Sequence, residues 1–173
     1  IVGRGTVDSI GLLVEGLDNT FTNMRIAKVQ IGVKLLKGGN YLRNIHPLYS
    51  LASGRDHYTD SIAFCDLAWH NWYDFCYSDE FATAFRITQS ASHYNNCFAY
   101  WYSKRGPKHV VFKCDKRFDS AVMNLHAGHR NGNAATANKI LEVGEEGGTG
   151  HFAFLHIDEP SVLSDRKHEE YAK

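Results

Sequence analysis

Residues 28–35, KVQIGVKL, alternate polar and apolar side chains along the whole stretch. The apolar set on one side is Val29, Ile31, Val33 and Leu35. A period of two is typical of a β-strand that buries one face and exposes the other. Residues 10–14, IGLLV, place three apolar side chains on one face in the same way. The sequence therefore predicts a mainly β protein.

Length and composition limit the classes of protein to consider. The chain has 173 residues, of which 43% are hydrophobic and 22% charged, as in one globular domain. We therefore expect a single globular domain over residues 1–173. No apolar run approaches the ~18 residues of a membrane span, so we expect no membrane partner. Nineteen Lys and Arg balance nineteen Asp and Glu, so no net field would attract nucleic acid.

Three short runs resemble one another and hint at a repeat. They are residues 62–66 (IAFCD), 110–115 (VVFKCD) and 152–158 (FAFLHID). Their phenylalanines, Phe64, Phe112 and Phe154, lie 48 and 42 residues apart, a spacing typical of a recurring supersecondary unit. We therefore expect either a compact, irregular β-sandwich, whose strands look alike because β-strands share residue types, or, if the repeat is genuine, a pseudo-threefold β-barrel or prism.

Two segments are candidates for short helices. Residues 61–77 place apolar side chains on one helical face, although two strands and a turn would fit equally. Residues 134–143 are rich in alanine, and Asn133 could cap a helix there. We therefore expect one or two short helices beside the strands.

The four cysteines indicate whether the protein belongs to an oxidising or a reducing compartment. Cys65, Cys76, Cys97 and Cys114 have 10, 20 and 16 residues between neighbours, and none of these spacings is that of a zinc or redox motif. An even number without metal spacing favours two disulfides and an oxidising compartment. We therefore expect a secreted, extracellular protein with two disulfides, the alternative being four buried free thiols.

Aromatic side chains gather in two places that also carry polar groups. Candidate ligand-binding residues are Trp69, Trp72, Tyr73, Asp74, Tyr100 and Trp101. A sugar ring offers one apolar face to an aromatic ring and a rim of hydroxyls to Asp, Asn and His. An apolar small molecule would suit the same mixture, and so would self-association. The same aromatic residues could also simply fill the core.

Catalytic and metal-binding patterns are weaker. The sequence has no nucleophile elbow, phosphate loop or zincin motif, and we expect no cofactor and no metal. One arrangement could support hydrolysis, with His70 as general base and Asp66 or Asp74 orienting it. The ten histidines would take up protons between about pH 7.5 and 5.5, so we expect stability or assembly to weaken in acid.

These observations favour a non-catalytic, lectin-like extracellular protein that binds a glycan and self-associates. The first alternative is an extracellular or egg carrier or storage protein for an apolar small molecule. The second is a secreted hydrolase that uses His70.

Overall fold

The computed structural model describes residues 1–48, 60–88, 91–101, 110–116, 118–129, 139–143, 150–153 and 156–157. Within these ranges the regular structure is all β, as predicted, and contains no helix. No helix there is long and apolar enough to cross a membrane. The strands form two sheets, one of six strands and one of ten, and every strand pair is parallel.

The six-stranded sheet consists of β1 (Ile10–Val14), β3 (Ile31–Leu35), β5 (Ile62–Asp66), β8 (Thr83–Ile87), β11 (Val110–Cys114) and β14 (Lys139–Val143), in that spatial order. The ten-stranded sheet consists of β2 (Thr20–Ala27), β4 (Tyr41–Leu48), β6 (Trp72–Asp74), β7 (Tyr77–Asp79), β9 (His93–Asn95), β10 (Phe98–Trp101), β12 (Ala121–Met123), β13 (His126–His129), β15 (His151–Ala153) and β16 (His156–Ile157).

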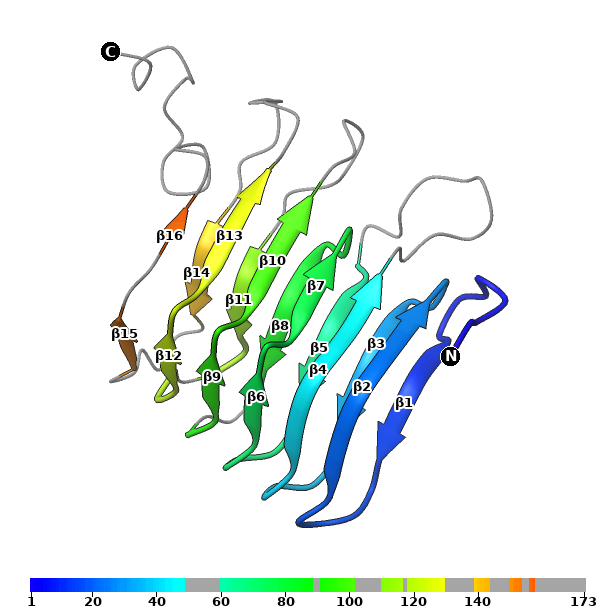
Figure 1. The fold of residues 1–173 in the computed structure, drawn as a ribbon, viewed down its shortest axis with the longest axis horizontal. Coiled ribbons are helices and arrows are strands. Elements are labelled where there is room, and N and C mark those ends of the chain that lie inside the picture. The colour runs from blue at the N-terminus through cyan, green and yellow to red at the C-terminus, as the bar shows by residue number, and fades with distance from the viewer. Residues whose placement is uncertain are drawn as a thin grey trace.

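The chain alternates between the two sheets and so winds into a parallel β-solenoid (Figure 1). One rung consists of a strand of the six-stranded sheet and the following segment of the ten-stranded sheet. Ile10 pairs with Ile31, and Ile62 with Thr83, so the shortest rungs contain 21 residues. The expected sandwich, barrel or prism is therefore wrong. Alternation predicts a strand with one buried face, and a solenoid satisfies that condition as well as a sandwich does.

Aromatic rings fill the space between the sheets. Phe64, Phe85 and Phe112 stack in successive rungs, with ring centroids 5.0 and 5.1 Å apart. From the facing sheet Tyr73 stacks on Tyr94 at 4.6 Å. These distances follow from the ~4.8 Å spacing of neighbouring strands, because identical side chains on paired positions must stack at that interval.

The predicted repeat is only partly right. Phe64 and Phe112 occupy one column, since both pair with Phe85 on the strand between them. Their 48-residue separation is thus two rungs rather than one unit. The third run begins in β15 of the ten-stranded sheet, and its Phe154 lies outside the described residues.

The helix predictions are wrong where the structure describes them. Residues 61–77 form β5, a turn, β6 and the start of β7, which confirms the alternative of two strands and a turn. Residues 139–143 form β14, which pairs with β11, so tertiary pairing outweighs the helix propensity of this segment. Residues 134–138 lie outside the described part of the chain.

The disulfide prediction is also wrong, because Cys65, Cys76, Cys97 and Cys114 are free and buried. Cys76 and Cys97 lie in the core one rung apart, where they pack as small apolar side chains. Burial raises the pKa of Cys76 to about 12 and that of Cys97 well above its usual value. Secretion therefore stays a prediction without a disulfide to support it.

A ladder of hydrogen-bonded polar side chains, most of them buried, fixes the corner between the two sheets. The side chain and backbone nitrogens of Asn19 donate to Asn40 Oδ1, both at 3.0 Å, and the backbone nitrogen of Asn40 donates to Asn71 Oδ1 at 2.9 Å. Asn71 Nδ2 and Ser92 Oγ in turn donate to the buried carboxylate of Asp66, at 2.8 and 2.9 Å. The ladder fixes where four strands of the ten-stranded sheet begin, because these strands directly follow Asn19, Asn40, Asn71 and Ser92.

Candidate functional site

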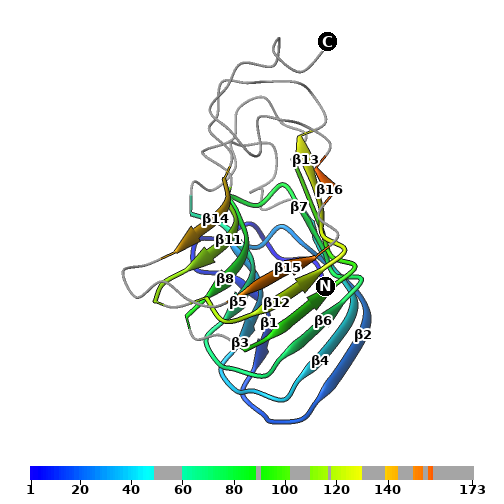
Figure 2. The same ribbon diagram turned by 90° about the vertical axis from the view of Figure 1, so that its left-hand side faces the viewer.

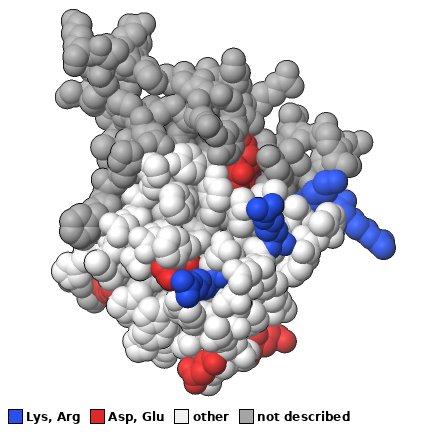
Figure 3. All heavy atoms as spheres, in the orientation of Figure 1, with Lys and Arg blue, Asp and Glu red and all other residues white. Residues whose placement is uncertain are grey.

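We call the solvent-facing side of the ten-stranded sheet the outer face. It faces the reader in Figure 1. In Figure 3 the described part of this face is mostly uncharged, and near its centre a basic side chain lies against an acidic one. The sheet is bent, so that β6 and β12 turn away from β7 and β13 (Figure 2). The candidate site lies on the outer face at this bend.

Aromatic side chains form a column on the outer face, at the first residues of three neighbouring strands, Tyr41, Trp72 and His93. Trp72 follows the corner residue Asn71 and pairs with Tyr41 on one side and His93 on the other. Its ring is 43% exposed and stacks on His93, with centroids 5.5 Å apart and an angle of 8° between the planes. The indole is therefore held in a fixed orientation with a large apolar surface in contact with solvent.

Asp74 lies two residues along the same strand and collects hydrogen bonds from three neighbours. Tyr41 Oη donates to its Oδ2 at 3.2 Å, and the side-chain nitrogens of Asn95 and Asn96 donate to its Oδ1 at 3.2 and 3.4 Å. Arg43 Nε lies 3.7 Å from Oδ2. Burial and the hydrogen bond to Asp74 raise the pKa of Tyr41, so this hydroxyl keeps its proton and remains a donor.

The bend itself is made by residues in the left-handed backbone region. This column is Asn23 (φ 57°), Asn44 (φ 53°), Phe75 (φ 52°), Asn96 (φ 51°) and Asn124 (φ 50°). Asn44 Nδ2 donates to Asn23 Oδ1 at 2.8 Å, and Asn124 Nδ2 to Asn96 Oδ1 at 3.1 Å. Asparagine tolerates this conformation, whereas a bulky side chain such as phenylalanine rarely adopts it. Phe75 therefore interrupts a ladder of amides at a conformational cost.

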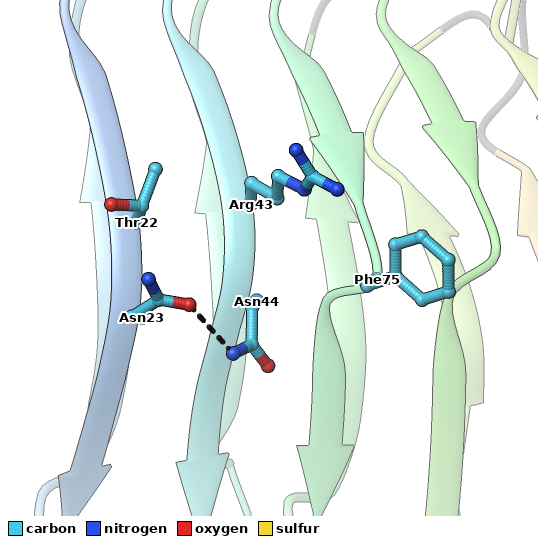
Figure 4. A pocket seen from close by; sticks show the side chains of 5 residues that line it. All are labelled: Thr22, Asn23, Arg43, Asn44 and Phe75. Atoms are coloured by element: carbon cyan, nitrogen blue, oxygen red, sulfur yellow. Dashed lines mark hydrogen bonds between the residues drawn. The ribbon is translucent and has the colours of Figure 1, made fainter.

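A hollow of about 420 Å³ lies beside this interruption. Its lining residues are Thr22, Asn23, Arg43, Asn44 and Phe75, drawn in Figure 4. The first two come from β2, the next two from β4, and Phe75 from the bend between β6 and β7. Phe75 is 47% exposed. The hollow thus combines an aromatic ring with amide, hydroxyl and guanidinium groups, which can stack on one face of a ligand and hydrogen-bond to its rim.

The structure separates the sequence-predicted ligand residues. Trp72 and Asp74 lie together on the outer face, whereas Tyr73 between them points inward and is 1% exposed. Trp69 lies in the turn between β5 and β6 and is 57% exposed. Tyr73 therefore presents no ring to a surface ligand.

The second predicted aromatic group lies elsewhere. Tyr100 belongs to β10 and pairs with Asp79 at the end of β7. The Tyr100 hydroxyl hydrogen-bonds to His126 Nδ1 at 2.8 Å. Trp101 is the last residue of β10, and its side chain lies outside the described part of the structure. Tyr100 is not among the residues that line the hollow.

The predicted hydrolytic pair is not assembled in this structure. His70 is exposed in the turn before β6, and its ring lies against Trp69. The Asp66 carboxylate is buried, with bonds from Ala68 and the corner ladder, and burial raises its pKa. Among the described residues, no hydrogen bond or ion pair joins His70 to Asp66 or Asp74.

The sequence-predicted ligand residues do not include Tyr41, His93, Arg43, Asn44 or Phe75, although Phe75 belongs to the aromatic cluster around Trp72. A signal for two of them exists, because Asn23 and Asn44 are 21 residues apart, as are Phe75 and Asn96.

Within the described ranges no group of three or more His, Cys, Asp or Glu residues could hold a metal ion.

Comparison with known proteins identifies no relative, since no family model, curated protein or solved structure matches the chain. The class that the fold defines is a parallel β-solenoid, and its function must be argued from the outer face.

Proposed function

We propose that this protein is a non-catalytic, extracellular protein that binds a glycan on its outer face. Two half-exposed rings, Trp72 and Phe75, lie on this face three residues apart in the chain. Hydrogen-bonding groups of Arg43, Asn44 and Asp74 accompany them. Rings that stack on a sugar, beside polar groups that bond its hydroxyls, are the features that such recognition needs.

The presence of Phe75 in the asparagine column is the observation that carries the proposal. A residue in a sparsely populated backbone region costs on the order of 1–3 kcal/mol, and such strain gathers at binding sites. Asparagine at this position would continue the amide ladder between Asn44 and Asn96. A ring that is strained, exposed and next to a hollow therefore favours a role in binding over a role in folding.

The interior offers less support for the alternative of a carrier for an apolar molecule. Stacked rings of Phe64, Phe85, Phe112, Tyr73 and Tyr94 occupy the described interior. An apolar ligand would have to displace them or bind on the surface. Self-association stays a prediction.

The test compares two exposed tryptophans. Trp72→Ala removes a ring of the proposed site, and Trp69→Ala removes a ring of similar exposure from the turn outside the sheet. We expect the parent protein to bind members of a glycan array. Trp72→Ala should lower the affinity for the selected glycan by about tenfold or more in isothermal titration calorimetry. Trp69→Ala should leave that affinity unchanged.

Two results would contradict the proposal. One is an array on which the folded parent protein binds no glycan. The other is a loss of affinity in Trp69→Ala that equals or exceeds that in Trp72→Ala, with both variants folded by circular dichroism.

A further inference from the structure

We infer that the hollow at the bend takes an acidic sugar, whose carboxylate pairs with the guanidinium of Arg43 while its ring lies against Phe75. This inference rests on the proposed function and names the chemical class of the glycan.

Arg43 is the charged residue among those that line the hollow. Its side chain is 58% exposed, and its ion pair with Asp74 involves Nε at 3.7 Å, beyond hydrogen-bond distance. Among the described residues, none accepts a hydrogen bond from either terminal nitrogen of Arg43. These two nitrogens form the planar fork that binds a carboxylate through two parallel hydrogen bonds.

Asp74 does not need Arg43 as its hydrogen-bond donor. Tyr41, Asn95 and Asn96 already donate to the two oxygens of this carboxylate. Asp74 therefore holds the stem of Arg43 near Nε and leaves the other edge of the guanidinium for a ligand. The Arg43 guanidinium extends from β4 toward the rung of Phe75 and away from Thr22 (Figure 4), so a ligand's acid group would meet its terminal nitrogens on the Phe75 side of the hollow.

Among the described residues, the amides of the hollow are joined by one hydrogen bond and keep further donor and acceptor capacity. Asn44 Nδ2 donates to Asn23 Oδ1 at 2.8 Å, which leaves Asn23 Nδ2 and Asn44 Oδ1 for other partners (Figure 4). Thr22 adds a hydroxyl that can donate or accept. A sugar ring carries hydroxyls that can satisfy each of these groups, which a small inorganic anion cannot do.

The exposed ring of Phe75 favours a sugar acid over an inorganic anion as the ligand. Its ring is 47% exposed and lines the same hollow as the guanidinium. Sulfate or phosphate has no apolar face to cover an aromatic ring, whereas the C–H face of a pyranose has one. A carboxylate attached to a pyranose matches both groups at once. Hexuronic acids and sialic acids share this chemistry, and the experiment separates them.

The experiment uses ligand pairs that differ only in charge. One pair is a tetrasaccharide that alternates glucuronic acid and N-acetylglucosamine, and the same compound with its carboxylates reduced to alcohols. The other is sialyllactose and its carboxyl-reduced form. We expect the parent protein to bind the acid of at least one pair between about ten and a hundred times more tightly than the alcohol. The pair that shows the preference identifies the class of acid.

Two arginine variants connect this preference to the hollow. Arg43→Gln should abolish the preference for the acid, because glutamine keeps hydrogen-bonding groups but removes the charge. Arg25→Gln is the matched control, since Arg25 is an exposed arginine of β2 that does not line the hollow, and this variant should keep the preference. Circular dichroism confirms that both variants are folded.

The outcomes separate this inference from the proposed function. Equal binding of acid and alcohol, lost in Trp72→Ala, would overturn the acidic-sugar inference and support glycan binding. A preference that survives Arg43→Gln would overturn the role of Arg43 and with it the inference. Absence of binding to any saccharide by the folded parent would overturn both.

Discussion

The interior of the solenoid and its outer face follow different rules from rung to rung. Inside, Phe64, Phe85 and Phe112 repeat one side chain through three rungs at nearly constant spacing. On the outer face, the asparagine column changes to Phe75 and then returns to asparagine at position 96. A side chain that repeats in every rung of a column indicates a requirement of the fold. A different side chain at one rung of an exposed column indicates a residue that the fold tolerates and that serves another role, such as binding.

Physical constraints explain the difference. An interior ring is enclosed by the rungs on either side and by the facing sheet, so a change of size leaves a void or a clash. An outer-face side chain has solvent on one side and can change without disturbing the neighbouring rungs. Substitutions there change the free energy of unfolding little unless the backbone is strained, as it is at Phe75.

The largest expected effect is on the interior column. Phe85→Ala removes the central ring of three, which touches Phe64, Phe112, Tyr73 and Tyr94. We expect the free energy of unfolding to fall by about 3–5 kcal/mol, because a buried phenylalanine loses both transfer energy and packing. Urea denaturation followed by circular dichroism measures the change.

The control for this prediction is a substitution in the same column that keeps most of the volume. Phe85→Leu should cost less than Phe85→Ala, and Trp69→Ala in the exposed turn should cost less than either. Similar losses in Phe85→Ala and Trp69→Ala would show that the interior column does not dominate stability.

The strands of this fold were predictable and their arrangement was not. Alternation at 28–35 and 10–14 correctly gave β3 and β1, because a half-buried strand has the same pattern in any sheet. The 21-residue rung was hidden because longer rungs interrupt it, as where Ile31 pairs with Ile62. Phe85 also escaped notice because its run, TAFRI, does not share the Cys or Asp of the runs around Phe64 and Phe112.

The candidate site was predictable only in part, for a similar reason. Aromatic density identified Trp72 and Asp74, but it also selected Tyr73, which strand alternation places on the opposite face. Arg43 and Phe75 come from neighbouring rungs, and only knowledge of the strand register brings them together. The disulfide prediction failed because an even number of cysteines does not distinguish disulfide-bonded cysteines from free cysteines that pack in the core.

A second prediction concerns an outer-face residue that behaves like an interior one. His46 stacks on Tyr77 at 4.2 Å, and burial, reinforced by Arg25, lowers its pKa to about 4. Asp79, 3.9 Å from His46 Nε2, acts in the opposite sense. Because the folded protein resists protonation of His46, stability should fall as the pH drops from about 6.5 to about 4, by up to about 3 kcal/mol.

His46→Phe isolates this effect, since phenylalanine keeps a ring against Tyr77 and has no proton to bind. The difference in unfolding free energy between parent and variant should depend on pH only within that interval. Asp66, whose pKa is raised by burial, favours the folded state as pH falls and is common to both proteins, so it cancels. A difference that stays constant from pH 7.5 to pH 4 would show that His46 is protonated as readily in the folded state as in the unfolded one.

The smallest expected effect tests the break in the asparagine column directly. Phe75→Asn relieves a left-handed conformation that costs a bulky residue about 1–2 kcal/mol and restores hydrogen bonds to Asn44 and Asn96. The substitution also removes a half-buried ring, and the loss of the contacts of this ring offsets much of the gain in stability. We therefore expect Phe75→Asn to match the parent in unfolding free energy within about 1 kcal/mol.

Phe75→Ala is the matched comparison, because it loses the same ring but keeps the unfavourable backbone and gains no amide. It should be less stable than Phe75→Asn by about 1–2 kcal/mol in urea denaturation. Both variants should lose affinity for the glycan, since both lack the ring. If Phe75→Asn is instead the less stable of the two, the ladder contributes nothing at this rung, and the phenylalanine then needs no binding role to explain it.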